Sequence, residues 1–493
     1  MESQNITPTQ PQDDPIIENK ELNIWEALIP IFVLVGMLFY NVFFVYGDDA
    51  LSGSNQFILL MGAAVAAAVG FRNKVSYKQM MEEVAVNVKS TTGALLILLM
   101  VGSLAGTLIS GVIPSMIYYG LQILNPTIFL AASVIICAII SIATGSSWTT
   151  SATVGIALIG IGNTLGISAG MTAGAVLSGA YFGDKLSPLS DTTNLAPTMA
   201  GGELFAHIKY MTLTTVPTIL VTLVVFIIIG LTIDTTGAPD ISDQLTAIDG
   251  AFNISPWLFL VPGVVIFMIV KKTQPLVALL AGTLLGGIVA IIAQPDIVAK
   301  VAGADSLTFN SAYKGVMNAM TVSSSVETSS VELNDLFTAK GMSGMLGTIW
   351  LIICAMVFGG VMDAIGALAR ISKALLSLAS SVFGLFASTV ASCLALNVTA
   401  SDQYLAIVVP GKMFKKAYEE KGLAPENLSR TLEDAGTVTS VLIPWNTCGA
   451  YQSGVLGVGV AEYFFFAIFN WLSPIMTLIF AAFNIKIKQL VKK

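Results

Sequence analysis

Charged residues are scarce in this sequence. Only 11% of its 493 residues are Asp, Glu, Lys or Arg, whereas 55% are hydrophobic. A soluble domain typically carries about 25% charged residues, so the composition excludes an ordinary water-soluble protein. Histidine is almost absent, because His207 is the single one. Zinc clusters and paired-histidine relays therefore do not fit this chain.

Several sequence motifs are also missing. The four cysteines, Cys137, Cys354, Cys393 and Cys448, lie in apolar segments without CxxC spacing, so we expect packing residues and no disulfide framework. No phosphate-binding P-loop is present, which argues against ATP-driven transport by this chain alone. No Gly-x-Ser-x-Gly motif frames Ser146, Ser147 or Ser190, so we expect no enzyme. A Ser-Lys hydrolase using Lys185 stays open as an alternative.

Long hydrophobic runs are what the sequence has instead. They occupy residues 24–45, 57–71, 94–113, 127–143, 211–233, 257–270, 275–293, 345–361, 381–396, 438–459 and 463–483. A helix needs roughly 20 residues to cross a bilayer core, and several runs reach this length. The shorter ones leave room for re-entrant hairpins or broken helices. We predict an all-α polytopic membrane protein with about 11 to 14 membrane segments.

The placement of Lys and Arg predicts the orientation. Residues 1–23 form a polar, acidic tail without the basic start of a cleavable signal peptide. The loop at 47–56 has no Lys or Arg, whereas the next loop carries Arg72, Lys74, Lys78 and Lys89. Because basic loops stay on the cytoplasmic side, the N-terminus is predicted to be cytoplasmic, as is the basic tail at 486–493.

The longest hydrophilic interruption divides the chain into two predicted membrane halves. The halves are 24–293 and 345–485, and the linker is 294–344. Part of this linker, 313–336, has the pattern of an amphipathic surface helix.

Two polar motifs interrupt the apolar sequence, and each occurs twice in the same order. They occupy residues 144–150 and 183–194, and again 397–404 and 442–451. Thr144 corresponds to Thr399 at an offset of 255, and Pro188 corresponds to Pro444 at 256. Paired interruptions of this kind in the two halves of a membrane protein indicate the binding site of a transporter.

The first half carries most of the predicted ion ligands. Hydroxyl-bearing residues crowd around 146–153, which favours a hairpin turn inside the membrane over ordinary packing of small residues. Pro188 then removes a backbone donor and breaks a helix. One carboxylate among neutral oxygens suits sodium better than calcium, although a polar surface loop is the alternative. The candidate ligands are Asp191, Ser146, Ser147, Thr149, Ser190, Thr192 and Asn194.

The second half repeats the breaks but places its carboxylate differently. Asp402 stands where the first half has Ser147, and Thr447 stands where it has Asp191. The further candidate ligands are Thr399, Ser401, Asn446 and Thr447. An ionised carboxylate inside a membrane is costly unless it holds a partner, and sodium and a proton are both suitable partners. We therefore predict an asymmetric site, with Asp191 as leading ligand of sodium and proton and Asp402 as its partner.

Five more side chains are candidates for a gate or for tuning the response to pH: Asp184, Lys185, His207, Glu433 and Asp434. Lys185 is placed to neutralise Asp184 or Asp191 in an empty site. His207, with an ordinary pKa near 6.5, is suited to tuning the response to pH, and an interfacial position is the alternative. Glu433 and Asp434, with Arg430 nearby, also fit a structural ion pair.

The motifs resemble those of the NhaC-type sodium/proton antiporters. The resemblance rests on Gly-Ser-Ser-Trp-Thr-Thr-Ser at 145–151, Gly-Asp-Lys-Leu-Ser-Pro-Leu-Ser-Asp at 183–191, Asn-Val-Thr-Ala-Ser-Asp at 397–402 and Leu-Ile-Pro-Trp-Asn-Thr at 442–447. It implies inverted repeats, an elevator-like transport domain beside a scaffold, and often a dimer. It also implies hairpin tips at 144–150 and 399–404, and broken helices at 187–194 and 443–449.

The expected function is secondary active exchange of Na⁺ for H⁺ across the cell membrane of a prokaryote. We expect no cofactor and no nucleic-acid partner. The same family includes exchangers of organic acids, such as malate against lactate, and amino-acid transporters, and these remain alternatives. A passive channel fits less well, because broken helices in both halves favour alternating access over an open pore.

Overall fold

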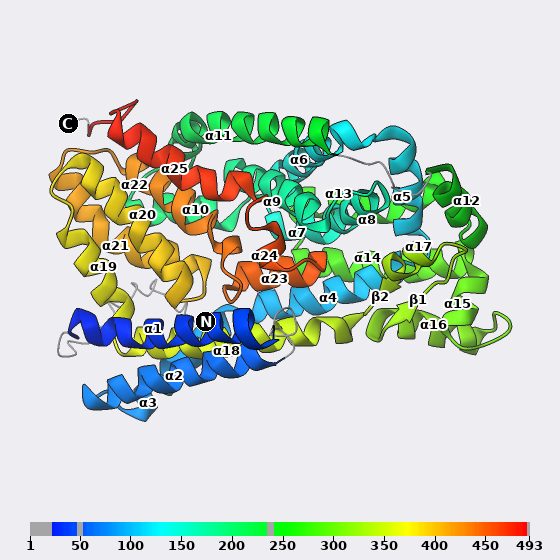
Figure 1. Ribbon diagram of the computed structural model, residues 1–493, viewed down its shortest axis with the longest axis horizontal. Helices are drawn as coiled ribbons and strands as arrows, with labels where there is room; N and C mark the ends of the chain where they lie inside the picture. Colours follow the sequence, from blue (N-terminus) through cyan, green and yellow to red (C-terminus); the bar gives the residue numbers. More distant parts are fainter. Residues whose placement is uncertain (1–21, 47–52, 234–240, 491–493) are drawn as a thin grey trace, which may run out of the picture.

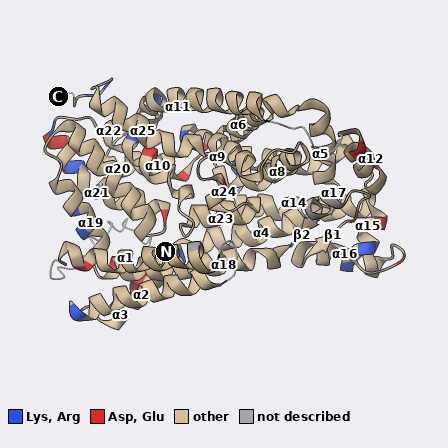
Figure 2. Cartoon of the chain, viewed as in Figure 1, with Lys and Arg blue, Asp and Glu red and all other residues tan. Residues whose placement is uncertain are grey.

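The computed structural model describes residues 22–46, 53–233 and 241–490. Predicted features in the tail before residue 22, in the loop at 47–52 and at 491–493 lie outside these residues. Most of the long helices run along the longest axis of the molecule, with α11 on one side and α1, α2, α3 and α18 on the other (Figure 1). Charged residues are concentrated toward the two ends of this axis (Figure 2). This distribution fits a bundle whose middle lies in a bilayer.

Seven helices of the described chain are long and apolar enough to cross a membrane. They are α1 with its π-helical end (Ile24–Tyr46), α2 (Ser54–Arg72), α6 (Pro126–Thr144), α11 (Leu204–Thr232), α14 (Pro275–Ala293), α18 with the preceding turn (Met342–Ala364) and α20 (Val382–Thr399). Two further pairs are bent spans: α3 (Tyr77–Ser90) with α4 (Thr92–Leu108), at 42°, and α12 (Ile241–Ala251) with η4 and α13 (Pro256–Val270), at 83°. The predicted helical membrane class, with broken helices, is confirmed.

Shorter elements complete the fold. They are α5 (Val112–Ile123), α7 (Ser147–Thr150), η3 (Ser151–Gly155), α8 (Ile156–Thr164), α9 (Ala169–Leu186), α10 (Asp191–Ala200), α15 (Pro295–Val301), α16 (Phe309–Thr321), α17 (Val331–Leu336), α19 (Ala367–Ser377), α21 (Gln403–Glu420), α22 (Pro425–Leu432), η6 (Glu433–Thr437), η7 (Ser440–Leu442), α23 (Thr447–Leu456), α24 (Val460–Tyr463) and α25 (Ile468–Ala482). The strands β1 (Ser324–Ser325) and β2 (Thr338–Ala339) pair antiparallel.

The predicted amphipathic helix at 313–336 is only partly formed. Helix α16 ends at Thr321, because Val322 is extended and β1 follows within three residues. The segment therefore folds as a helix, a short ladder and the one-turn-and-a-half helix α17, not as one continuous helix.

The two polar motifs of each half build the same sequence of elements. In the first half a helical hairpin, α6 to α8, is followed by the broken helix α9–α10 and by α11. In the second half the hairpin α20–α21 is followed by the broken helix from α22 to α23 and by α24 and α25. The repeated order agrees with two related halves. Their inverted orientation, and the total of 11 to 14 segments, stay predictions.

Small residues allow the first hairpin to pack closely against the broken helix. A Cβ atom at Gly179 of α9 would lie 2.2 Å from the Val134 carbonyl oxygen of α6, and one at Gly183 would lie 2.5 Å from that of Ala138. The Ser141 hydroxyl donates to the Ala180 carbonyl at 2.6 Å. Close backbone approach of this kind is how membrane helices associate without a hydrophobic driving force. It fixes the hairpin tip beside the break in α9–α10.

Several basic segments lie at one end of the molecule. The Nε of Arg370 in α19 donates to the Leu22 carbonyl at 2.7 Å, just before α1. Glu26 of α1 and Arg72, at the end of α2, are 3.7 Å apart. The start of α1, the end of α2 and α19 therefore share one end of the bundle.

Candidate functional site

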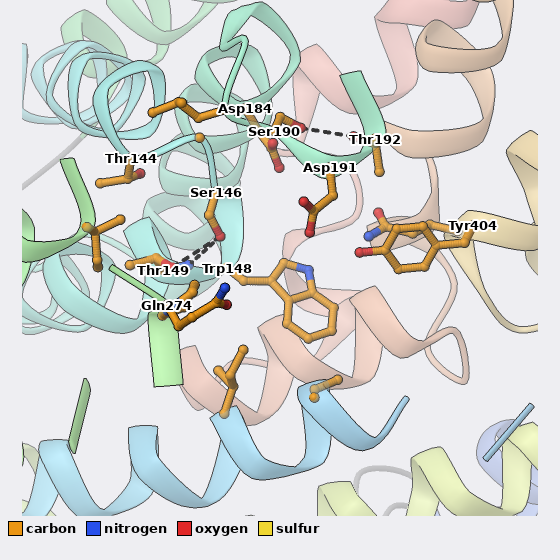
Figure 3. Close-up of a pocket in the computed structure, with 18 of the residues that line it drawn as sticks. Thr144, Ser146, Trp148, Thr149, Asp184, Ser190, Asp191, Thr192, Gln274 and Tyr404 are labelled. Atoms are coloured by element: carbon orange, nitrogen blue, oxygen red, sulfur yellow. Dashed lines mark hydrogen bonds between the residues drawn. The ribbon is translucent and has the colours of Figure 1, made fainter. Parts of the chain in front are cut away.

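A cavity of about 440 Å³ lies where the hairpin tips and the helix breaks of both halves meet. The opposite wall comes from the start of α4 and from the loop between α13 and α14. The motif residues that line it are Thr144, Gly145, Ser146, Trp148, Thr149, Asp184, Leu189, Ser190, Asp191, Thr192, Asp402, Gln403, Tyr404 and Thr447. The paired polar motifs thus converge on one polar space (Figure 3).

The first hairpin tip is a left-handed turn followed by a helix start. Gly145 has φ +70°, a conformation that glycine adopts without steric cost. The Ser146 hydroxyl caps the next helix by accepting from the Thr149 amide at 3.2 Å, and it also accepts from the Thr149 hydroxyl at 3.1 Å. A Cβ atom at Gly145 would lie 2.5 Å from the Leu189 Cβ. The tip therefore rests directly on the first helix break.

Asp184 holds this tip in place. Its Oδ2 accepts from the Ser147 amide at 3.1 Å and from the Ser147 hydroxyl at 2.6 Å. Hydrogen bonds to a carboxylate are about twice as strong as those between neutral groups. The Ser147 hydroxyl therefore hydrogen-bonds to Asp184, and Ser147 does not line the cavity.

The polar groups around the first break stabilise its backbone. Asn194 donates to the carbonyls of Pro188 and Ser190, at 3.0 and 2.7 Å. The Ser190 and Thr192 hydroxyls are 3.2 Å apart and share a hydrogen bond. Ser190 and Thr192 line the cavity, whereas Asn194 is not among its lining residues.

Asp191 is the exception at this break. It is the first residue of α10 and is exposed to the cavity. Within the described part of the chain its carboxylate has no hydrogen bond and no ion pair, and it points into the space beside Trp148 and Tyr404 (Figure 3). A free carboxylate at the first turn of a helix is favoured by the helix dipole and stays available to a cation.

Asp402 has a different environment. It is buried, with 4% of its surface exposed. It caps α21 by accepting from the amides of Tyr404 and Leu405, at 2.8 and 3.1 Å. Its second oxygen accepts from the Thr447 hydroxyl at 3.4 Å, across the two motifs of the second half. Asp402 therefore organises the second tip, and both Asp402 and Thr447 line the cavity.

The other predicted ligands of the second half lie behind the cavity wall. Asn446 caps α23, and its Nδ2 donates to the Asn397 carbonyl at 3.0 Å. The hydroxyls of Thr399 and Ser401 are buried without a partner in the described chain. Ser401 adopts φ +59°, which is unusual for a residue other than glycine. These three residues support the tip and do not line the cavity.

Trp148, Tyr404 and Gln274 are among the cavity residues that were not predicted as ligands. Trp148 stacks on Tyr451 at 3.9 Å between ring centroids, which joins the first tip to α23. Tyr404 lines the cavity from α21, and Gln274 lines it from the loop after α13. Trp148 and Tyr404 stand inside the recognised motifs, so their position was a usable signal. Gln274 lies outside these motifs, in the loop between α13 and α14, and no sequence pattern pointed to it.

Four of the candidate gate and pH-tuning residues lie away from the cavity. Lys185 pairs with Asp434 and so does not neutralise Asp184 or Asp191. His207 is fully buried rather than interfacial, and its Nδ1 is 2.7 Å from the Ser429 hydroxyl. Glu433 is fully buried beside the hydroxyls of Thr437 and Thr192. Only Asp184 of this group lines the cavity.

The cavity is negatively charged overall. Asp184, Asp191 and Asp402 line it, and Lys272 is the one basic residue among its lining residues. A recess dominated by one sign of charge concentrates ions of the opposite sign. The geometry therefore suits a cation held by carboxylate and hydroxyl oxygens.

Comparison with known proteins agrees with this geometry. The sequence profile of the Na⁺/H⁺ antiporter family matches residues 179–485. A Na(+)/H(+) antiporter NhaC of Alkalihalophilus pseudofirmus is 37% identical over 428 residues, covering 87% of this chain and 90% of that protein. The chain belongs to the Na⁺/H⁺ antiporter family. The resemblance in the motifs is thereby confirmed.

Relatives with other cargo also align along most of this antiporter-family chain. The malate-2H(+)/Na(+)-lactate antiporter of Bacillus subtilis is 35% identical over 425 residues, covering 85% of this chain and 86% of that protein. The arginine/ornithine antiporter ArcD of Halobacterium salinarum is 32% identical over 467 residues, covering 93% and 92%. Family membership therefore leaves more than one class of cargo to consider.

Proposed function

We propose that this protein exchanges Na⁺ for H⁺ across the cell membrane of a prokaryote. The observation that carries the proposal is the carboxylate of Asp191, which is unpaired among the described residues and faces a negatively charged cavity at the meeting point of two broken helices. Asp191 is the leading Na⁺ ligand, and Asp402 with the Thr447 hydroxyl forms the opposite wall. The similarity to antiporters named for Na⁺ and H⁺ supports this assignment.

Sodium fits the donor set. It is a hard cation and prefers carboxylate, carbonyl and hydroxyl oxygens, which are the donors that the tips and breaks present here. Because Asp402 already accepts two backbone amides, part of its charge is stabilised by the protein itself. Asp191 has no such partner and therefore gains most from an arriving cation.

The position of the cavity supports an elevator-like movement. The cavity lies between the two motif units and a wall formed by α4 and the loop between α13 and α14. Sliding of the motif units against this wall would carry the bound ion from one side of the membrane to the other. The basic segments gathered near the start of α1 support a cytoplasmic N-terminus. The homodimer stays a prediction.

Proton flux in proteoliposomes tests the proposal. Purified protein is reconstituted with an internal pH dye, and Na⁺, Li⁺ or K⁺ is added outside. We expect Na⁺ to drive H⁺ movement and Asp191→Asn to abolish it. Asp249→Asn, which changes an exposed carboxylate of α12, is the matched control and should retain the flux. Absence of Na⁺-driven H⁺ flux with the unsubstituted protein would reject the proposal.

The size of the cavity favours one second candidate, exchange of an organic substrate with Na⁺ or H⁺. A space of about 440 Å³ is much larger than a single ion needs, and it is within the range of small-molecule sites. Trp148 and Tyr404 add flat apolar walls. Adding malate, lactate, arginine or ornithine to the same proteoliposomes separates the two functions. An H⁺ flux that requires one of these compounds would establish the second candidate.

A further inference from the structure

The cavity wall opposite the motifs carries a positive charge. This wall is formed by the start of α4 and by the loop that joins α13 to α14, and Lys272 of that loop is the one charged side chain among its described lining residues. The three acidic lining residues, Asp184, Asp191 and Asp402, all belong to the motifs on the other side. The positive and negative charges of the cavity therefore come from different parts of the molecule.

The loop fixes the backbone of Lys272 at this wall. Lys272 adopts a left-handed conformation, with φ +64°. Its amide donates to the Ile269 carbonyl at 2.8 Å, and the Thr273 amide donates to the Met268 carbonyl at 3.0 Å. These bonds satisfy carbonyls at the end of α13, as left-handed turns commonly do at helix ends. Pro275 then starts α14 and restricts the loop from its other side.

The side chain of Lys272 differs from that of its neighbour Lys271. Both are exposed, but Lys271 is not among the lining residues, and its Nζ lies over the Phe267 ring at 5.6 Å from the centroid. Lys272 makes no ion pair with any residue that the structure describes. Its ammonium therefore acts on an ion in the cavity through its electric field, without neutralising one particular carboxylate.

A cavity with three carboxylates attracts divalent cations as well as Na⁺. Carboxylate oxygens are the usual ligands of Ca²⁺ in proteins. Coulomb energy is proportional to the charge of the ion, so the acidic residues attract Ca²⁺ twice as strongly as Na⁺ at the same position. A fixed positive charge repels the two ions in the same proportion. Lys272 therefore weakens the binding of Na⁺ and weakens the binding of a divalent cation more.

We propose that Lys272 is a specificity-determining residue, whose positive charge on the facing wall disfavours divalent cations and leaves the cavity to Na⁺. This inference rests on the proposed Na⁺/H⁺ exchange and adds the means by which its site selects a monovalent ion. Specificity is a difference of two affinities, so a repulsive element that penalises the competitor more than the cargo raises it.

The proposal makes a quantitative statement about two affinities. Because the repulsion energy doubles with the charge of the ion, removing it should strengthen Ca²⁺ binding by the square of the factor for Na⁺. This relation holds for any distance and any dielectric constant, provided that the two ions occupy the same position. A substitution that only loosened the site would weaken both ions instead.

The experiment measures ²²Na⁺ binding to the detergent-solubilised protein and its displacement by Ca²⁺. It is carried out at low ionic strength, where screening of exposed charges is weak. For Lys272→Gln we expect Na⁺ affinity to rise about threefold and Ca²⁺ affinity therefore about tenfold. Lys272→Arg keeps the charge and should keep both affinities. Lys271→Gln removes an adjacent exposed charge that does not line the cavity, and it should leave both affinities unchanged.

Each outcome supports or overturns the assignment. If Lys272→Gln changes neither affinity, or changes both by the same factor, the inference is wrong. If Lys271→Gln produces the same changes, general surface charge is responsible and the inference is again wrong. If the unsubstituted protein binds Na⁺ but shows no Na⁺-driven H⁺ flux in proteoliposomes, the proposed function fails, whereas the two affinities still decide the role of Lys272. If it binds no Na⁺, both are wrong.

Discussion

At the scale of single residues, the two cavity aspartates do different work. Asp191 makes no hydrogen bond or ion pair in the described chain, whereas Asp402 caps a helix and contacts Thr447. The free carboxylate should dominate equilibrium binding of Na⁺. The capped one should contribute to both binding and folding.

Binding of Na⁺ should stabilise the folded protein through Asp191. A ligand present at 100 times its dissociation constant adds about 2.7 kcal/mol to the free energy of unfolding. We expect Na⁺ to raise the melting temperature of the detergent-solubilised protein relative to choline, and Asp191→Asn to remove this rise. The melting temperature without Na⁺ should change little, because no contact is lost. An unchanged Na⁺ response in Asp191→Asn would contradict the assignment.

The cap formed by Asp402 can be separated from its charge. Asparagine is as good a helix cap as aspartate, whereas alanine costs about 1 kcal/mol. We therefore expect Asp402→Asn to fold normally but transport Na⁺ poorly, and Asp402→Ala to lose stability as well. Denaturant unfolding in detergent measures the stability of both variants, and ²²Na⁺ uptake measures their transport. Equal stability of the two variants would show that the cap contributes little.

At the scale of elements, the sequence predicted the breaks but not all of their contacts. Pro188 and the hydroxyl-rich run at 144–150 were sufficient to place a break and a tip, because both features act locally on the backbone. The pairing of Lys185 with Asp434 joins residues 249 positions apart. No local pattern reports such a contact, which depends on how α9 packs against η6. The position of Gln274 in the cavity also depends on long-range packing, so the sequence did not predict it.

The contact between the first tip and the first break should be sensitive to one methyl group. Gly145→Ala would place a Cβ atom 2.5 Å from Leu189 Cβ and 2.8 Å from its carbonyl carbon, in a left-handed conformation. We expect a loss of about 1–3 kcal/mol in stability, and reduced Na⁺ transport because the tip is displaced. Thermal unfolding and ²²Na⁺ uptake provide the measurements.

Gly366→Ala is the matched control for this change. Gly366 also has positive φ, +75°, but a Cβ atom there would meet nothing within 4 Å. The control therefore bears the conformational cost without the clash. It should keep its transport activity, and an equal loss of transport in both variants would show that backbone strain alone is responsible.

At the scale of the whole molecule, the architecture divides into a part that holds the ion and a part that faces it. Hydropathy predicted most of the long membrane helices, because each of them is a continuous apolar run in the sequence. It did not predict α9, whose glycine-rich sequence ends in Asp184 and Lys185 and is buried between other helices. The relative movement of the two parts was implied by resemblance alone. It calls for a test that does not depend on any ion ligand.

A disulfide between the two parts should stop exchange. Gly454 lies in α23, in the part that holds the ion, and it packs against Thr348 of α18, which packs along α2 and α3 and which we assign to the part that faces the ion. A Cβ atom at Gly454 would lie 3.2 Å from the Thr348 Cβ, close to the separation of about 3.5–4.5 Å in disulfides. In a background lacking the four native cysteines, Thr348→Cys with Gly454→Cys should lose Na⁺-driven H⁺ flux on oxidation and regain it on reduction. Val265→Cys with Gly282→Cys, at 3.8 Å between α13 and α14, links helices of one part and should stay active. Continued exchange by the oxidised first pair would mean that α23 does not move against α18 during transport.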